Sequence, residues 1–185
     1  MDDYGYLADD VSCTCRIGDV FMNEQFKEIF KKIAVLPYEK YSAETDLMIG
    51  AIGLEMNAVY SRLYQMQMKY SHAEEYLKDK RINDIEETMQ EYRDMLKLME
   101  KHILGSQKNL LECTDKDEAV RQVICEFLTL FIRKLVILEQ TSSLSDSEKG
   151  ISEQISEYQK NLESACNISR EYIRLHVGDT SYIAD

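Results

Sequence analysis

The sequence predicts an all-α fold: an antiparallel bundle of four long helices, preceded by a short helix and an extended or strand-like N-terminal tail. The first observation is the distribution of proline, since Pro37 is the only proline in 185 residues. A proline inside a helix removes a backbone donor and costs about 3 kcal/mol. The second observation is that apolar residues after Pro37 recur every three or four positions, which is typical of amphipathic helices.

The N-terminal end differs from the rest of the chain. Within residues 1–18, apolar and polar side chains alternate from Val11 to Ile17, which is the period of a half-buried strand. The acidic residues before this stretch fit a disordered tail equally well, so both interpretations stay open. Residues 20–35 carry apolar side chains at helical spacing, and we expect a short amphipathic helix that ends before Pro37.

Two long helices are expected next, over residues 43–78 and 84–111. Ser42 is a good N-cap for the first, because its hydroxyl can accept a hydrogen bond from the first helical turn. Asn83 begins a capping-box pattern at the start of the second, and Gly105 weakens or ends that helix. The apolar positions of both helices are typical of a seam between packed helices.

The last two long helices are expected over residues 115–141 and 146–177. Ser145 and Glu148 form a second capping-box pattern. Gly178 is suited to end the final helix, because glycine tolerates the left-handed conformation of a helix C-cap. The breaks between the four long helices are short, which favours antiparallel neighbours.

Length and charge narrow the classes of function. We predict one helical-bundle domain over residues 19–185, behind a tail formed by residues 1–18. The chain has 34 acidic and 22 basic residues, a formal net charge of −12. An acidic surface repels nucleic acid, so no nucleic-acid partner is expected. Neither a secretory signal nor a membrane-spanning apolar stretch is found, so we expect a cytoplasmic protein that does not bind a membrane.

The N-terminal segment supplies candidates for binding a partner protein. An exposed strand edge can pair with another chain, and surface tyrosines bury area while their hydroxyls stay hydrated. The partner is either another protein or a second copy of the chain, as in a homodimer. We assign partner binding to residues Val11, Cys13, Cys15, Ile17, Tyr4 and Tyr6.

One candidate for chemistry is His102, in the run Lys-His-Ile-Leu-Gly-Ser at residues 101–106. The run resembles the His-x-Leu-Lys-Gly-Ser motif of histidine phosphotransfer domains, which are four-helix bundles that carry phosphate on the histidine. This chain lacks the lysine, and its glycine comes one position early, about 100° around the helix. The resemblance implies phosphotransfer through His102. The alternative is an exposed histidine near a helix C-terminus, where its positive form is favoured.

A second candidate is the pair Arg170 and His176, near the end of the last predicted helix. Their spacing resembles the Arg-x4–6-His motif of the HEPN ribonuclease and toxin families, whose small helical bundles dimerise to complete a site. The resemblance implies that Arg170 and His176 cleave a phosphodiester bond in RNA. Glu171 follows the arginine, and the acidic surface suits RNA poorly, so a chance spacing on a helix is the alternative.

No cofactor and no metal site is predicted. Carboxylate di-iron bundles need a Glu-x-x-His pair on two helices, and this spacing is absent from the chain. A structural zinc site needs about four converging ligands. Cys13 and Cys15 have no second pair of this kind, and Cys113, Cys125 and Cys166 lie apart in the sequence. We expect these cysteines to be structural thiols.

Methionines on the first two long helices allow two interpretations. Met48, Met56 and Met66 share one face of the first, and Met89 and Met99 lie on the second. Such a face either fills the core of the bundle or forms an adaptable binding groove, because methionine is flexible and polarisable.

Taken together, these features favour a non-enzymatic interaction protein, which as an adaptor, chaperone or inhibitor presents a helical face to another protein. The bundle has more apolar seam than four helices need internally, and a second copy could cover the surplus. The second hypothesis is a HEPN-like ribonuclease or toxin-type protein acting through Arg170 and His176. The third is a phosphotransfer bundle acting through His102.

Overall fold

The structure is a computed structural model that describes residues 24–37, 40–77, 82–114, 116–142 and 148–177. These residues form five α-helices and contain no strand. The predicted all-α class is therefore confirmed.

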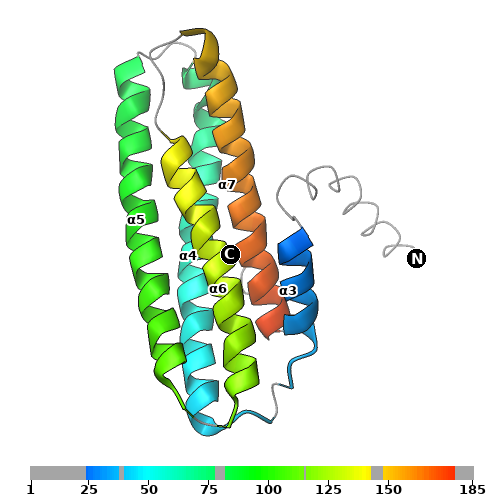
Figure 1. Cartoon of the computed structure of the whole chain (residues 1–185). Helices are drawn as coiled ribbons and strands as arrows, with labels where there is room; N and C mark the ends of the chain where they lie inside the picture. The colour runs from blue at the N-terminus through cyan, green and yellow to red at the C-terminus, as the bar shows by residue number, and fades with distance from the viewer. Residues whose placement is uncertain (1–23, 38–39, 78–81, 115, 143–147, 178–185) are drawn as a thin grey trace, which may run out of the picture.

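Four long helices form the bundle: α4 (Ala43–Leu77), α5 (Ile82–Glu112), α6 (Glu118–Thr141) and α7 (Glu148–Val177). They run alternately up and down, so that each lies antiparallel to the next (Figure 1). Each helix packs on its two neighbours in a ring of the order α4, α5, α6, α7. This arrangement confirms the predicted antiparallel bundle of four long helices.

The short helix α3 (Glu24–Ala34) lies outside this ring and packs against α6 and α7 (Figure 1). Its apolar residues follow one face at helical spacing, and that face is turned inward. Phe26, Ile29, Phe30 and Ile33 are all buried there. The predicted short N-terminal helix is thus a covering element on one side of the bundle.

The four sides of the bundle are unequal. The contacts of α4 with α7 and of α5 with α6 are much more extensive than those of α4 with α5 and of α6 with α7. On the α4/α7 side the absence of a side chain at Gly53 leaves room for His176, since a Cβ added at Gly53 would lie 3.3 Å from the Cδ2 atom of His176. The other two sides are wider, and α3 covers one of them.

The core is one continuous apolar cluster along the bundle axis. Its members come from all five helices, and large side chains dominate it. The most deeply buried include Tyr158, Tyr172, Phe127, Phe131, Ile29, Ile33, Ile49, Met56, Leu63, Met66, Met89 and Leu96.

Two helix starts meet at the end of the bundle where α4 begins. The predicted cap of α4 is confirmed, because the backbone N–H of Thr45 donates to Ser42 Oγ at 3.2 Å. The start of α6 differs from the prediction of residue 115, since the helix begins at Glu118. The Asp117 carboxylate accepts the backbone N–H of Ser42 at 2.5 Å rather than capping its own helix. This bond joins the starts of α4 and α6.

The other boundaries agree closely with the prediction. Gly105 neither ends nor interrupts its helix, because α5 continues to Glu112. The side chains of Asn83 and Ser145, which were assigned to capping boxes, lie outside the described part of the chain. The predicted tail at residues 1–18 lies outside it as well.

Candidate functional site

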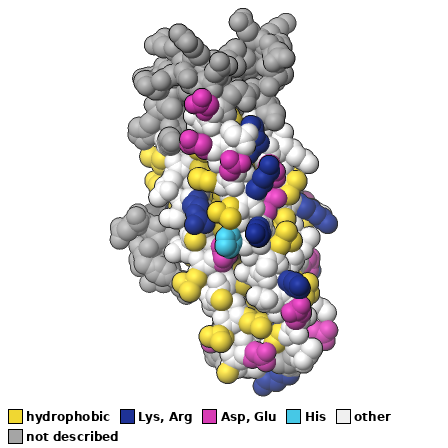
Figure 2. Space-filling view, turned by 90° about the vertical axis from the view of Figure 1, so that its left-hand side faces the viewer, with side chains coloured by type: hydrophobic (Ala, Val, Ile, Leu, Met, Phe, Trp, Pro, Cys, Tyr) yellow, Lys and Arg dark blue, Asp and Glu magenta, His cyan; other side chains and the backbone are white. Residues whose placement is uncertain are grey.

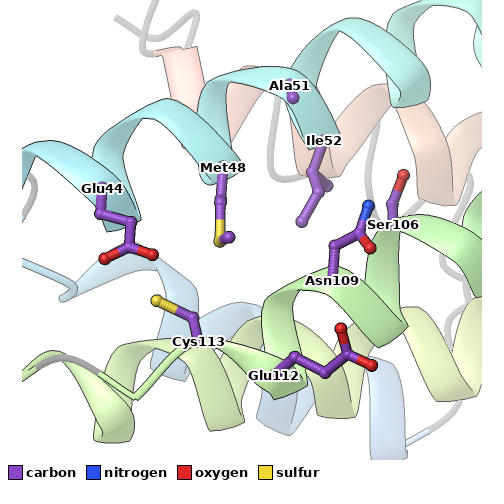
Figure 3. Close-up of a pocket in the computed structure, with 8 residues that line it drawn as sticks. All are labelled: Glu44, Met48, Ala51, Ile52, Ser106, Asn109, Glu112 and Cys113. Atoms are coloured by element: carbon purple, nitrogen blue, oxygen red, sulfur yellow. The ribbon is translucent and has the colours of Figure 1, made fainter.

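The second wide side of the bundle lies between α4 and α5, where none of the described helices covers it, and it contains a groove of about 290 Å³. It lies near the end of the bundle where α4 begins and α5 ends. In Figure 3, Met48 and Ile52 point from α4 toward α5, and Ser106 and Asn109 point back from α5. The residues that line this α4/α5 groove are Glu44, Met48, Ala51, Ile52, Ser106, Asn109, Glu112 and Cys113.

The α4/α5 groove has an apolar floor and an acidic edge. Ile52 is buried and Met48 half-buried, so the floor is continuous with the core. The lining includes the carboxylates of Glu44 and Glu112 and contains no lysine or arginine. The Sγ atom of Cys113 points toward α4 within the same groove (Figure 3). A site of this composition can bind an apolar side chain flanked by positive charge.

Exposed leucines also occur on the two helices that form the groove. Leu47 and Leu54 are 76% and 75% exposed, and they lie on either side of Ala51 at helical spacing on α4. Leu98 lies on α5, 48% exposed, two turns before Ser106. Figure 2, which views the bundle from the α5 side, shows apolar side chains among charged and polar ones. Exposed apolar residues grouped in this way are typical of interaction surfaces.

The covered wide side shows how the bundle holds a helix. Phe30 of α3 lies 5.6 Å from Phe127 of α6, measured between ring centroids, and Phe127 stacks on Tyr172 of α7 at 4.4 Å. At the edge, Lys32 Nζ of α3 forms an ion pair with Glu126 Oε2 of α6 at 3.4 Å. Aromatic packing and a lysine–glutamate pair thus seat a short amphipathic helix between α6 and α7.

Arg170 and His176 lie on different faces of α7. Six residues along a helix separate them by about 9 Å along the axis and about 120° around it. Arg170 is exposed, whereas His176 packs between helices, with its ring parallel to Tyr172 at 5.7 Å and its edge against Gly53. Burial lowers the pKa of His176, and the charge of Asp46 opposes this effect. The packing of His176 is sufficient to explain its position.

His102 is exposed on α5, one helical turn before Ser106. It therefore borders the α4/α5 groove rather than the core. Gly105 adjoins open space, because a Cβ added there would have no atom within 4 Å. His102, the residue that resembles the histidine of a phosphotransfer domain, thus lies on an exposed surface at the edge of the groove.

The six N-terminal candidates lie outside the described residues, which begin at residue 24. They are Val11, Cys13, Cys15, Ile17, Tyr4 and Tyr6.

The cysteines and methionines of the described residues are largely core residues. Cys113, Cys125 and Cys166 are buried free thiols, and burial raises the pKa of Cys166 to about 12. Within the described ranges, no group of three or more His, Cys, Asp or Glu side chains is arranged to hold a metal ion. The buried methionines Met56, Met66, Met89 and Met99 fill the core, and Met48 alone of the five predicted ones lines the α4/α5 groove.

Sequence reasoning missed two polar clusters between helices. Arg121 of α6 is buried and donates from Nη1 to Thr45 Oγ1 of α4 at 3.5 Å. Between α5 and α6, burial raises the pKa of Glu100 to about 7, and the hydrogen bond and charge of Glu139 act in the same direction, while Lys97 opposes them. Glu100 follows the buried Met99 in the sequence, and Arg121 follows the buried Val120. Their place beside core residues was the one sign in the sequence that these side chains are partly buried.

Comparison of the chain with protein-family models, curated proteins and solved structures gave no match. None of the described helices is long and apolar enough to cross a membrane.

Proposed function

We propose that this protein is a non-enzymatic interaction module that binds another protein through the α4/α5 groove. One observation carries the proposal. The two wide sides lie opposite each other in the ring of helices, and among the described helices α3 covers the α6/α7 side only. No described residue covers the α4/α5 side in the same way, and its apolar floor is open to a partner.

The positions of the catalytic candidates agree with a binding role. His102 is on α5, whereas Arg170 and His176 are on α7, with Arg170 exposed and His176 packed against Gly53. In a cytoplasmic protein, binding through a helical groove suits an adaptor, a chaperone or an inhibitor. These three roles differ in the partner and share the same surface.

The proposal is tested by blocking the groove with a large side chain. Ala51 lines the groove and is exposed, so Ala51→Arg obstructs it without filling the core. Ala119 is exposed on α6, and Ala119→Arg is the matched control with the same change of size and charge. Wild type and both variants are immobilised and used to capture proteins from a native lysate of the source cells, followed by mass spectrometry.

We expect one or more proteins to be captured by the wild type and by Ala119→Arg and to be lost from Ala51→Arg. Circular dichroism and thermal unfolding establish that both variants are folded. Equal capture by all three proteins would contradict the proposal, because the partner would then bind elsewhere. Ribonuclease activity that depends on His176 would contradict the non-enzymatic role.

A further inference from the structure

We propose that the α4/α5 groove takes a basic amphipathic α-helix, a segment of a partner protein with apolar residues on one face and lysine or arginine beside them. This inference rests on the proposed function, because it specifies the chemistry of the partner at the same site. It follows from three features: the helix already seated on the opposite side, the apolar floor of the open groove, and the charge at its edge.

The first feature is α3, which shows the kind of segment that fits a wide side of this bundle. It presents Phe26, Ile29, Phe30 and Ile33 at spacings of three and four residues, and all four are buried. The α4/α5 side lies opposite in the ring, and its two helices are in contact about as little as α6 and α7 are. A helix of three turns with such a face therefore matches its geometry.

The second feature is the apolar surface that such a helix would cover. Met48 and Ile52 form the floor of the groove, and Met48 can adapt to side chains of different shape. Leu98 is exposed on α5, and Leu47 and Leu54 flank Ala51 on the outer surface of α4. An apolar stripe at helical spacing can cover this floor and remove it from water, which is the main source of affinity in helix-in-groove binding.

The third feature is charge, which selects a basic helix over an acidic one. Glu44 and Glu112 line opposite walls of the groove, and Glu55 lies one turn beyond Ala51 on α4. On the covered side, Lys32 of α3 forms an ion pair with Glu126 of α6. The net charge of −12 adds a long-range attraction for a positive segment.

Two peptides test this inference, both derived from the sequence of α3, EQFKEIFKKIA. The basic peptide KQFKKIFKKIA and the acidic peptide EQFEEIFEEIA keep the same apolar face and differ only in charge. A staple on the polar face holds each one helical, since isolated helices this short are marginal in water. Binding of fluorescent peptides to the full chain is measured by anisotropy at low and at high salt.

We expect the basic peptide to bind and the acidic peptide to bind at least about tenfold more weakly at low salt, with the difference reduced at high salt. Glu112→Lys should weaken the basic peptide by about fivefold, in the range expected for reversing an exposed ion pair. Glu153→Lys, which changes an exposed glutamate of α7, is the matched control and should have a small effect. Ala51→Arg should abolish binding.

Three results would overturn the inference. Equal binding of the two peptides would show that charge does not select the partner. Binding of the basic peptide that survives Ala51→Arg would place it on another surface, such as the α6/α7 side. A stable homodimer that Ala51→Arg converts to a monomer would make a second copy the occupant of the groove.

The outcome is separable from that of the proposed function. If Ala51→Arg abolishes capture of a cellular partner while neither peptide binds, the groove is the binding site and the chemistry assigned to the partner is wrong. If Ala51→Arg abolishes binding of the basic peptide but leaves the capture of every cellular partner unchanged, the groove does prefer a basic helix and the proposed function is wrong.

Discussion

Gly53 of α4 lies close to His176 of α7. A Cβ at residue 53 would lie 3.3 Å from Cδ2 and 3.6 Å from Nε2 of the imidazole. Gly50 lies one turn earlier on α4 and Gly105 on α5, and a Cβ at either would have no atom within 4 Å. The three glycines thus share a helical backbone and differ in the space around them.

This difference predicts the effect of alanine at each position. Alanine in a helix interior is favoured over glycine by about 0.5–1 kcal/mol. We expect Gly50→Ala and Gly105→Ala to raise the free energy of unfolding by about this amount each, and Gly53→Ala to gain less or to lose stability, because His176 must shift. Urea unfolding of the three variants measures this order.

The cause is checked by combining Gly53→Ala with His176→Ala. In the double variant the contact is absent, so alanine at residue 53 should regain its helix-propensity advantage. If Gly53→Ala is as stabilising as Gly50→Ala in the wild-type background, the His176 imidazole can move away from the added methyl group at no cost in stability. That result would contradict the explanation.

The raised pKa of Glu100 predicts that the free energy of unfolding depends on pH. Its pKa is about 7 in the folded chain and 4.5 as an unperturbed group. The folded state therefore binds the proton more tightly, and the stability contributed by this residue is lost as the pH rises from about 4.5 through about 7. Glu100→Gln stays neutral and should stabilise the protein by about 1 kcal/mol at about pH 8 and by less at about pH 5.5.

Thermal unfolding of Glu100→Gln and wild type over this range of pH measures the effect. Glu153→Gln, at an exposed site on α7, is the control for removing a negative charge. A stability difference between Glu100→Gln and wild type that is the same at every pH would show that Glu100 ionises normally in the folded chain.

At the scale of the helix, the cap of α4 is the best-defined end. Ser42 Oγ accepts the backbone N–H of Thr45. Replacing an N-cap serine by alanine typically costs about 1 kcal/mol, and by glycine only a few tenths. We therefore expect Ser42→Ala to lower the free energy of unfolding by about 1 kcal/mol and Ser42→Gly by less.

Ser61 provides the comparison, because it is exposed in the middle of the same helix. Ser61→Ala should be neutral or slightly stabilising, since alanine is the better helix former. Urea unfolding monitored by circular dichroism compares the variants. A loss at Ser61 as large as that at Ser42 would rule out capping as the cause.

The helices could be predicted from the sequence because each carries its own evidence: apolar spacing, a capping residue and no internal proline. The start of α6 could not, because it depends on a residue far away in the sequence. Asp117 looks like an ordinary residue of the first turn, and only the fold brings it to the N–H of Ser42. Local patterns do not report such long-range bonds.

At the scale of the whole molecule, a series of rings connects three helices. Phe127 of α6 contacts Phe26 and Phe30 of α3, Phe131 one turn further along α6, and Tyr172 of α7. Tyr172 in turn stacks on His176. Phe127 therefore links α3 and α7 to α6 through ring contacts.

Removing this ring should destabilise the whole fold. We expect Phe127→Ala to lower the free energy of unfolding by about 3–5 kcal/mol, through lost burial and the cavity left behind, and Phe127→Leu to cost less. Urea unfolding measures both. Phe131→Ala is the comparison within the same helix, and a smaller loss at Phe127 than at Phe131 would contradict the central role of Phe127.

The candidate site was less accessible to prediction than the fold. The sequence indicates that Met48 and Ile52 belong to an apolar seam, but it does not show which sides of the bundle are close and which are wide. That choice depends on packing between distant residues, such as Gly53 against His176. Likewise, the histidine motifs are local patterns, and their placement on separate surfaces required the fold.

The direct connection between α3 and α4 affects which of the two wide sides a helix of a partner protein can bind. Residues 35–42 join the helices directly, so α3 is held next to its own site. A short tether of this kind gives a roughly millimolar effective concentration. A free helix must compete with this tethered segment at the α6/α7 side, whereas no described segment of the chain competes for the α4/α5 groove. Selectivity for the α4/α5 groove would therefore follow from chain connectivity even if both sides favour the same kind of helix.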